Sequence, residues 1–493
     1  MTLRRIGFPL LAVLAIACGG SPQSPTAGPA RVGAPSPPVS QPGSPIAVEN
    51  RRPGGTGWQM NERAAPGQLE AYTGAPSVEH GEPIELHASA DRTGTFDWEL
   101  WRLGWYGGAG GRLAARGGGV PVSRQPVPAP DPTTGLVACR WPVSVAIPTA
   151  PEFTTGVYLV KLTRSDGPQA VVPVVIRSDE HRGAAMFQAS FTTYQAYNAW
   201  GGKSLYDGKP AAVEVSFDRP FAEDNGSGEF FRYERWFVLW VESRGFDLVY
   251  LTNLDVDRDP SLLSGQRLFL SVGHDEYWSR REREAVQAAL DAGTSLAFFS
   301  ANASYWQIRL EPSRTDGRAA RTEVCWKERA KAEDPQRATP LVTARWRDPP
   351  VSEPEAALIG VMFSCWEKST TDWVVKNASA WPYEGTGLHD GDRIPGIVGY
   401  ETDRTSESTP EETVVLSSSP VADVHGRSDV QEGAVRDLPS GAFVFAAGTI
   451  EWSWGLAKPG VVDPRVQRIT ENVLRHAGLA PDDPVPAQGA ASG

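Results

Sequence analysis

The sequence predicts two domains, an immunoglobulin-like β-sandwich followed by a doubly wound α/β domain. Between residues 51 and 180, short alternating strands are separated by turns rich in glycine and proline, which is typical of a β-sandwich. From residue 182 the pattern changes to strand, helix, strand, which is typical of a mostly parallel sheet with helices on both faces. The chain has 493 residues, enough for more than one domain.

The β-sandwich prediction covers residues 51–180 and depends on short strands, some of which alternate apolar and polar residues. A turn with the sequence Ser165-Asp166-Gly167 joins the last two of them. A motif with the sequence RLGWYGG begins at Arg102. We interpret it either as a surface that contacts the next domain or as a glycine-rich turn with buried aromatic residues. The predicted strands lie at 84–88, 96–103, 156–162 and 170–176.

The α/β prediction covers residues 182–480. Two segments, 229–244 and 280–292, are predicted helices that end before Gly245 and Gly293, because glycine readily adopts the left-handed backbone that closes a helix. A last helix is predicted at 463–477. The irregular stretch from 310 to 440 is interpreted as insertions around the sheet. The predicted strands lie at 246–251, 266–272, 294–300, 357–363, 413–416 and 442–447.

The N-terminus has the features of an export signal. Arg4 and Arg5 precede an apolar run at 6–17, which is too short to span a bilayer. The sequence LAIAC, which ends at Cys18, resembles a lipoprotein lipobox. We therefore predict a lipoprotein-type signal peptide at 1–17 and an exported protein, anchored to the membrane on the extracytoplasmic side by lipidated Cys18. The alternative is a plain cleaved signal, with Cys18 lost or free.

Low-complexity segments flank the predicted domains. Residues 18–50 are rich in proline, serine and glycine, a composition that does not support a packed core, so we predict a linker there. Residues 481–493 are predicted to be a disordered tail. The linker would hold the folded domains away from a membrane surface.

Charge and cysteine content narrow the classes of function. The net charge is −12 and the chain has no basic run, so nucleic-acid binding is a poor hypothesis. After Cys18 the chain has three cysteines and no CxxC motif, which argues against a four-cysteine zinc site. Outside the cytoplasm one disulfide and one free thiol are expected. We pair Cys325 with Cys365, which leaves Cys139 free.

Three polar clusters in the α/β part follow predicted strands or lie in their loops. The densest is the turn from His274 to Ser279, between a predicted strand and a predicted helix, with Asn302 at the end of the neighbouring strand. The other two lie at 193–206 and 448–455. In a doubly wound sheet the carboxyl ends of the strands meet at one edge, where ligands bind. We therefore expect an enzyme site at this edge.

Taken together, these motifs resemble the large (beta) subunit of N,N-dimethylformamidase and its relatives. The resemblance depends on the order of TYxAYN, GGxSLY, HxEY and a late Glu-Trp, and it covers residues 80–480. It implies that the α/β domain is a class I glutamine amidotransferase-like domain, with a flavodoxin-like, doubly wound sheet. It also implies a mononuclear ferric ion (Fe3+) held by two tyrosines and one glutamate, and hydrolysis of a carbon–nitrogen bond in a small linear amide.

The resemblance assigns the metal ligands residue by residue. It makes Tyr194, Tyr206 and Glu276 the ligands of the iron, with Tyr197 as an alternative for one of the two tyrosines. Phenolate and carboxylate are hard anionic oxygen donors, and they suit a ferric ion. Zinc in the same site is the less favoured alternative.

The resemblance also places further polar residues at the site. It places His274 beside the iron, and Asn302 and Glu451 among the polar residues that line the site. From the chemistry of these side chains we expect Glu451 to act as general base on a bound water, His274 as proton donor or orienting group, and Asn302 as hydrogen-bond donor to the developing oxyanion. No cysteine follows the strand that ends at Ser300 and no GxSxG motif is present. Thiol and serine hydrolase mechanisms are therefore disfavoured.

A second function class fits the same sequence. The alternative to a metal-dependent amidase is a non-catalytic binding lipoprotein outside the cytoplasm, for example for carbohydrate, with a degenerate site. Metal content separates the two hypotheses. The expected partner of the enzyme is a small-molecule amide. The characterised dimethylformamidase works with a small partner subunit, and a homo-oligomer is the other assembly considered for this chain.

Overall fold

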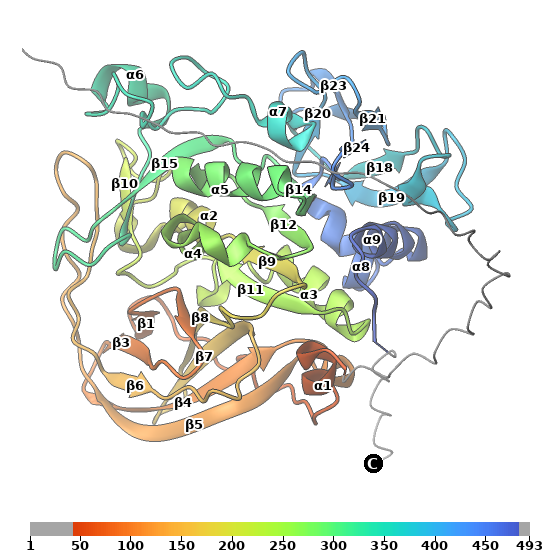
Figure 1. The fold of residues 1–493 in the computed structure, drawn as a ribbon. Coiled ribbons are helices and arrows are strands. Elements are labelled where there is room, and N and C mark those ends of the chain that lie inside the picture. Colours follow the sequence, from red (N-terminus) through yellow and green to blue (C-terminus); the bar gives the residue numbers. More distant parts are fainter. Residues whose placement is uncertain (1–42, 483–493) are drawn as a thin grey trace, which may run out of the picture. The chain divides into compact units, whose positions relative to one another are not determined.

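The computed structural model describes residues 43–482 of the chain (Figure 1). Before residue 180 the chain forms two sheets, and all four strands predicted in this part are confirmed. Apolar side chains of both sheets share one core, in which Leu86 and Phe96 are fully buried. Assignment to the immunoglobulin-like folds stays a prediction. In spatial order the sheets are β2 (Ser77–Glu79), β8 (Gln169–Arg177), β7 (Gly156–Arg164), β4 (Gly94–Leu103) and β5 (Gly111–Val122), and β1 (Leu69–Thr73), β3 (Ile84–Ala90) and β6 (Val145–Ile147).

A seven-stranded sheet forms the centre of the part that follows residue 182. Its first five strands in space are mutually parallel, and counted along the chain they lie in the order 2-1-3-4-5. That order is one of the common orders of doubly wound sheets, so we keep the flavodoxin-like assignment as a proposal. In spatial order the strands are β11 (Leu248–Thr252), β9 (Ala185–Ala189), β12 (Leu268–His274), β14 (Ser295–Ala301), β25 (Phe443–Ala446), β24 (Ala434–Asp437) and β21 (Val414–Val415).

Helices cover both faces of this sheet. Successive residues of a strand point to opposite faces, so neighbouring residues of one strand belong to two different cores. Phe187 and Phe299 belong to the core under α3 (Glu234–Ser243) and α9 (Pro464–His476). Met186 and Phe298 belong to the core under α4 (Asn253–Arg258), α5 (Arg280–Asp291) and α7 (Glu355–Ile359). The chain therefore buries both faces of the sheet, as the continuous apolar runs of its strands indicate.

The helix ends agree with the sequence at most positions. Ser279 caps α5, since its Oγ accepts a hydrogen bond from the backbone N–H of Glu282 and the Glu282 carboxylate accepts one from the N–H of Ser279. Gly245 and Gly293, the predicted ends of two helices, have φ values of +71° and +101°. The helix predicted from 229 begins only at Glu234, since the residues before it form turns.

The stretch between β14 and β25 contains α6 (Ala330–Glu333), α7, strands β21 and β24 of the large sheet, and most strands of four small sheets, which β10 (Glu214–Ser216) and β13 (Tyr277–Ser279) join from earlier in the chain. The strand predicted at 357–363 is wrong: Gly360, with φ +93°, ends α7, and a strand starts only at Met362. In spatial order the small sheets are β10 (Glu214–Ser216), β16 (Thr322–Val324), β15 (Trp306–Glu311) and β13 (Tyr277–Ser279); β17 (Met362–Trp366) with β20 (Glu401–Arg404); β18 (Thr371–Val374) with β19 (Arg393–Val398); and β22 (Ser419–Ala422) with β23 (Ser428–Gln431).

The predicted linker ends earlier than residue 50. Residues Pro45–Asn50 form helix α1, which buries Ile46 and Glu49, because Ser44 caps its N-terminus and proline occupies its first turn. The predicted signal peptide, Cys18 and the rest of the linker lie outside the described residues, as does the predicted tail from 483 onward. Among residues 43–482 no helix combines the length and apolar character that crossing a bilayer requires.

The disulfide predicted between Cys325 and Cys365 is absent from the structure. Both cysteines are buried free thiols, and so is Cys139. The physical reason is their position: Cys325 packs with Tyr277 and Trp306 in one apolar cluster, whereas Cys365 belongs to the large core of the central sheet. The spacing of two Cys-Trp pairs in the sequence does not reveal this separation.

Candidate functional site

The candidate site lies at the carboxyl ends of β9 and β12, two neighbouring parallel strands. The strand that follows β9 in the chain, β11, is added on one side of this pair, and the strand that follows β12, β14, is added on the other side. The strand order therefore reverses between β9 and β12. Ligands of doubly wound sheets bind at such a point. Helix α2 (Phe191–Tyr197) follows β9 and carries Tyr197 at its end, while β12 ends at His274.

Two tyrosine hydroxyls converge on the carboxylate of Glu276. The hydroxyl of Tyr197 lies 2.8 Å from Glu276 Oε2, and that of Tyr206 lies 3.1 and 3.2 Å from the two carboxylate oxygens. The hydroxyl oxygens are 3.1 Å apart, and the rings stack at 4.4 Å between centroids. Burial and the negative charge of Glu276 raise the pKa of both tyrosines well above the usual range.

A cation and a third tyrosine adjoin this cluster. The hydroxyl of Tyr277 donates to that of Tyr206 at 2.6 Å. The Nζ of Lys327 lies 3.1 Å from the centroid of the Tyr206 ring, and it has no hydrogen-bond partner among the described residues. A cation over an aromatic face stabilises a negative charge that develops on it. Lys327 could not be predicted from the sequence, because it lies in the irregular stretch between 310 and 440.

His274 is completely buried among three carboxylates. Its Nδ1 lies 2.8 Å from Glu229 Oε2, while its Nε2 lies 3.2 Å from Glu401 Oε2 and 3.4 Å from Glu276 Oε2. Burial lowers the pKa of His274, but the three carboxylates outweigh it and raise the pKa well above the usual range. Glu229 and Glu401 were missed from the sequence, because neither follows a predicted strand.

Asn302 is brought to the same place, as the sequence predicts. Its Nδ2 donates to Glu401 Oε2 at 2.9 Å, and its backbone N–H donates to Asp403 Oδ1 at 2.8 Å. Its φ of +51° is uncommon for a residue other than glycine, and such backbone conformations cluster at functional sites. Burial raises the pKa of Asp403 to about 7. Strand β20, which carries Glu401 and Asp403, therefore closes one side of the site.

The structure replaces Tyr194 by Tyr197 as the partner of Glu276. Tyr194 is buried in α2, where its ring packs against Phe191 and Phe221 at 5.1 and 6.3 Å between centroids. Its hydroxyl accepts and donates no hydrogen bond among the described residues. Burial and the charge of Glu234 raise the pKa of Tyr194 well above the usual range. Tyr194 is therefore a core residue, and the alternative considered for the sequence is the one that the structure supports.

Glu234 gives a prediction about pH. Burial raises its pKa from 4.5 to about 8, so the folded chain keeps a proton that the unfolded chain loses. Stability should therefore fall as pH rises through this range, by at most about 1.4 kcal/mol per pH unit from this group. Glu234→Gln removes the group that titrates. The free energy of unfolding of the variant, measured in urea and compared with that of the parent, should therefore increase as pH rises from about 5 to about 8.

A matched control keeps this comparison specific. Gln can still accept the 3.2 Å hydrogen bond that the N–H of Ser190 donates to Glu234 Oε1. Glu411→Gln, at an exposed position, should leave the pH dependence of the parent unchanged. A stability difference between Glu234→Gln and the parent that is the same at every pH would contradict the buried proton.

Glu451, the predicted general base, lies outside the cluster. Its Oε2 accepts a hydrogen bond of 2.9 Å from the hydroxyl of Thr370, and burial raises its pKa to about 6. The carboxylate that faces His274 and Asn302 is that of Glu401 instead. The late Glu-Trp pair is therefore buried in the fold, and no hydrogen bond or ion pair among the described residues joins Glu451 to His274 or Asn302.

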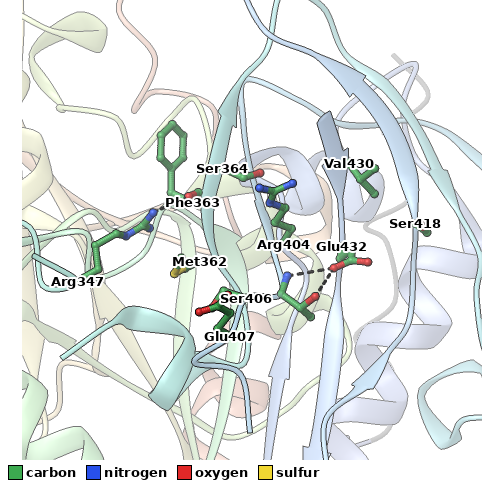
Figure 2. Close-up of a pocket in the computed structure, with 11 residues that line it drawn as sticks. Arg347, Met362, Phe363, Ser364, Arg404, Ser406, Glu407, Ser418, Val430 and Glu432 are labelled. Atoms are coloured by element: carbon green, nitrogen blue, oxygen red, sulfur yellow. Dashed lines mark hydrogen bonds between the residues drawn. The ribbon is translucent and has the colours of Figure 1, made fainter. Parts of the chain in front are cut away.

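A large cavity, of about 660 Å³, lies beside β17 and β20, and none of its lining residues belongs to the Tyr–Glu cluster (Figure 2). Its arginines are already paired: Arg347 lies 2.7 Å from Glu355, and Arg404 lies 2.7 Å from Asp429. Glu432 accepts hydrogen bonds from the backbone N–H and the hydroxyl of Thr405 (Figure 2). Both arginines of the cavity are thus neutralised by carboxylates, so the cavity offers no free cation for an anionic ligand.

The sheet order and the cluster define an α/β protein with an oxygen-rich site of two tyrosines and a carboxylate. A family profile described as "N,N-dimethylformamidase beta subunit-like, C-terminal" matches residues 97–467. The chain belongs to this family, since the match covers most of its length. The resemblance seen in the sequence motifs is thereby confirmed, and membership indicates an amidohydrolase of the dimethylformamidase type.

Comparisons with individual proteins add little. No curated protein matches the chain at a significant level. Among solved structures, a Paenibacillus sp. cycloisomaltooligosaccharide glucanotransferase complexed with cycloisomaltoheptaose matches with 14% identity and a TM-score of 0.16. That match covers 27% of this chain and 19% of the other, so it supports no statement about fold or function.

Proposed function

We propose that this protein hydrolyses a carbon–nitrogen bond in a small linear amide, using a ferric ion held by Tyr197, Tyr206 and Glu276. The observation that carries the proposal is the convergence of two phenol oxygens and one carboxylate within 2.8–3.2 Å. When bound, the ion would polarise the amide carbonyl and lower the pKa of a bound water. Membership of the dimethylformamidase-like family supports this reaction class.

The donor set fits a ferric ion. All three groups are hard oxygen donors, and three protein ligands leave open positions for water and substrate. Residues that contact the ligands hold them in place, since Tyr277 donates to the Tyr206 oxygen and the N–H of Glu276 donates to Thr193 Oγ1 at 2.9 Å. Lys327 over the Tyr206 ring favours the phenolate form that a ligand requires.

The residues around the cluster can handle protons at defined atoms. Glu401 Oε2 lies where it can accept a proton from an attacking water, between His274 Nε2 and Asn302 Nδ2. The bond from Nδ1 of His274 to Glu229 directs Nε2 into the site, so that Nε2–H can donate to substrate or leaving group. Asn302 Nδ2 provides a neutral donor for a developing oxyanion.

Metal content together with the visible spectrum tests the proposal. Protein purified without its signal segment should contain about one iron per chain and show a tyrosinate-to-iron charge-transfer band. Release of an amine from a panel of small formamides and acetamides should depend on that iron. Zinc at the same stoichiometry, without colour, would support the same hydrolysis with the other metal.

The contrary result is equally clear. Protein that holds no metal and no colour after reconstitution with iron would defeat the proposal and favour a binding protein. Glu276→Gln is the matched variant, since it keeps the shape of the side chain but removes the anionic donor. It should lose iron and colour while its unfolding temperature without metal stays near that of the parent.

A further inference from the structure

A small cavity lies where strands β1 and β8 face helix α2 (Figure 1). Its volume is about 10 Å³, roughly the space that one water molecule or one monatomic ion needs. Its lining residues do not include those of the Tyr–Glu cluster. Three phenylalanines and Val172 form much of the apolar wall. The polar residues that line the cavity are Arg219, Arg321, Gln195, Tyr72 and Thr73.

Arg219 is a buried cation without a carboxylate partner. It is 1% exposed, and four of its hydrogen bonds go to backbone carbonyls. The other goes from Nε to the neutral Oε1 of Gln195, at 3.3 Å. Burial lowers the pKa of Arg219 to about 10, so the side chain stays protonated at neutral pH. Neutral oxygens thus satisfy its N–H groups but do not balance its charge.

Arg321 brings a free hydrogen-bond donor to the same cavity. Its Nε and Nη2 donate to Asp218 Oδ1, at 3.0 and 2.7 Å. Its Nη1 is buried and donates to no described residue, although the side chain is only 5% exposed. A buried donor without an acceptor costs about 1–3 kcal/mol. An acceptor that is not part of the chain is therefore expected near Nη1.

The acids around the cavity leave one positive charge unbalanced. Asp218 is shared by Arg321 and Arg318, at 2.7 and 2.9 Å. Arg318 also pairs with Asp316, at 2.8 Å. With Arg219, three guanidinium groups thus accompany two carboxylates. Excess charge that is buried in this way requires a counterion.

Glu323 does not supply the missing charge. It is the carboxyl group that acts most strongly on Arg219, but no ion pair between the two forms in the part of the chain that the structure describes. Neither of its oxygens accepts a hydrogen bond there, and the residue is completely buried. Burial raises the pKa of Glu323 well above the usual range, so the group keeps its proton and is neutral.

We propose that this cavity binds a monovalent halide ion of the size of chloride, which accepts a hydrogen bond from Arg321 Nη1 and balances the charge of Arg219. Water would satisfy the donor but not the charge, and a polyatomic anion such as sulfate is too large for the space. The ion would join β1 to α2, the helix that ends at Tyr197. The proposal does not depend on the function proposed for the Tyr–Glu cluster.

The test uses the full chain and replaces sodium methanesulfonate by NaCl or NaBr at constant ionic strength, so that screening stays the same. Each halide should raise the unfolding temperature along a saturating curve, as a ligand of the folded state does. Crystals grown with NaBr should give an anomalous peak in the cavity, beside Arg321 Nη1. Water at that position in the bromide crystals, or an unfolding temperature that does not depend on the anion, would overturn the proposal.

Gln195→Glu separates this cavity from other halide sites. The variant keeps the acceptor for Arg219 and Asn198 but adds a carboxylate beside the Arg219 guanidinium. Without halide it should therefore be more stable than the parent, and it should bind halide at least about tenfold more weakly. Gln59→Glu, at an exposed position, is the matched control and should respond to halide as the parent does.

Val172→Ile tests the same cavity without a change of charge. Its additional methyl group would occupy space that the ion needs, so halide binding should again weaken at least about tenfold. If Gln195→Glu and Val172→Ile both gain as much stability from halide as the parent does, the ion binds elsewhere and the proposal is wrong.

Discussion

Tyr197→Phe is expected to remove most of the iron from the proposed site, whereas Tyr194→Phe should leave iron and colour in place. Tyr197 reaches Glu276 at 2.8 Å, while the Tyr194 hydroxyl has no hydrogen-bond partner among the described residues. Removing a ligand should weaken iron binding more than about 100-fold, since residues that merely support ligands are worth about 10–100-fold. Iron per chain and the charge-transfer absorbance measure the difference.

The two variants control for each other. Each removes one hydroxyl from a tyrosine of the same helix, α2, so a general effect of losing a phenol would appear in both. Tyr194→Phe should also keep or raise the unfolding temperature, because it deletes a buried hydroxyl that lacks a partner. Loss of iron in Tyr194→Phe with retention in Tyr197→Phe would return the ligand role to Tyr194.

The sequence could predict those site residues that follow regular elements. His274 and Asn302 lie at the ends of strands whose apolar runs are unmistakable, and Glu276 lies between such a strand and a capped helix. Their positions follow from the rule that strand ends meet at one edge. Tyr194 and Tyr197 are three residues apart on one short helix, and spacing alone does not decide which of them turns towards Glu276.

The remaining site residues could not be predicted, because they come from segments without periodicity. Glu229 lies in turns before α3, Lys327 follows the small strand β16, and Glu401 begins strand β20. Tertiary contacts position all three. Helix α1, by contrast, could have been predicted, since Ser44-Pro45 is a typical helix start. The proline-rich composition around it led to the prediction of a linker instead.

Arg102→Met is expected to cost about 3–5 kcal/mol of the free energy of unfolding, the largest stability effect that we predict. Arg102 in β4 and Glu242 in α3 are both 0% exposed and bind through two hydrogen bonds, of 2.8 and 2.9 Å. Removing the guanidinium leaves a carboxylate buried and uncompensated. Urea unfolding, followed by circular dichroism, measures the loss.

The size of this effect depends on what else the carboxylate binds. Glu242 also accepts hydrogen bonds from Tyr250 at 2.7 Å and from Asn50 at 2.8 Å. The Tyr106 hydroxyl, from the RLGWYGG motif, lies 3.1 Å from the Arg102 guanidinium. That motif is therefore the contact with the neighbouring α/β elements that the sequence suggested, and the ion pair joins β4 to α1, α3 and β11.

A double variant separates the charge from the packing. Arg102→Met combined with Glu242→Gln should recover part of the loss, because the amide keeps partners for Tyr250 and Asn50 while the buried charge disappears. Arg329→Met is the surface control: its pair with Glu333 is exposed, so it should change stability by less than about 1 kcal/mol. A cost for Arg102→Met as small as that of the surface control would show that water or a shifted side chain compensates Glu242. In that case the contact between β4 and α3 would be held by apolar packing alone, and the two regions would be free to unfold in separate steps.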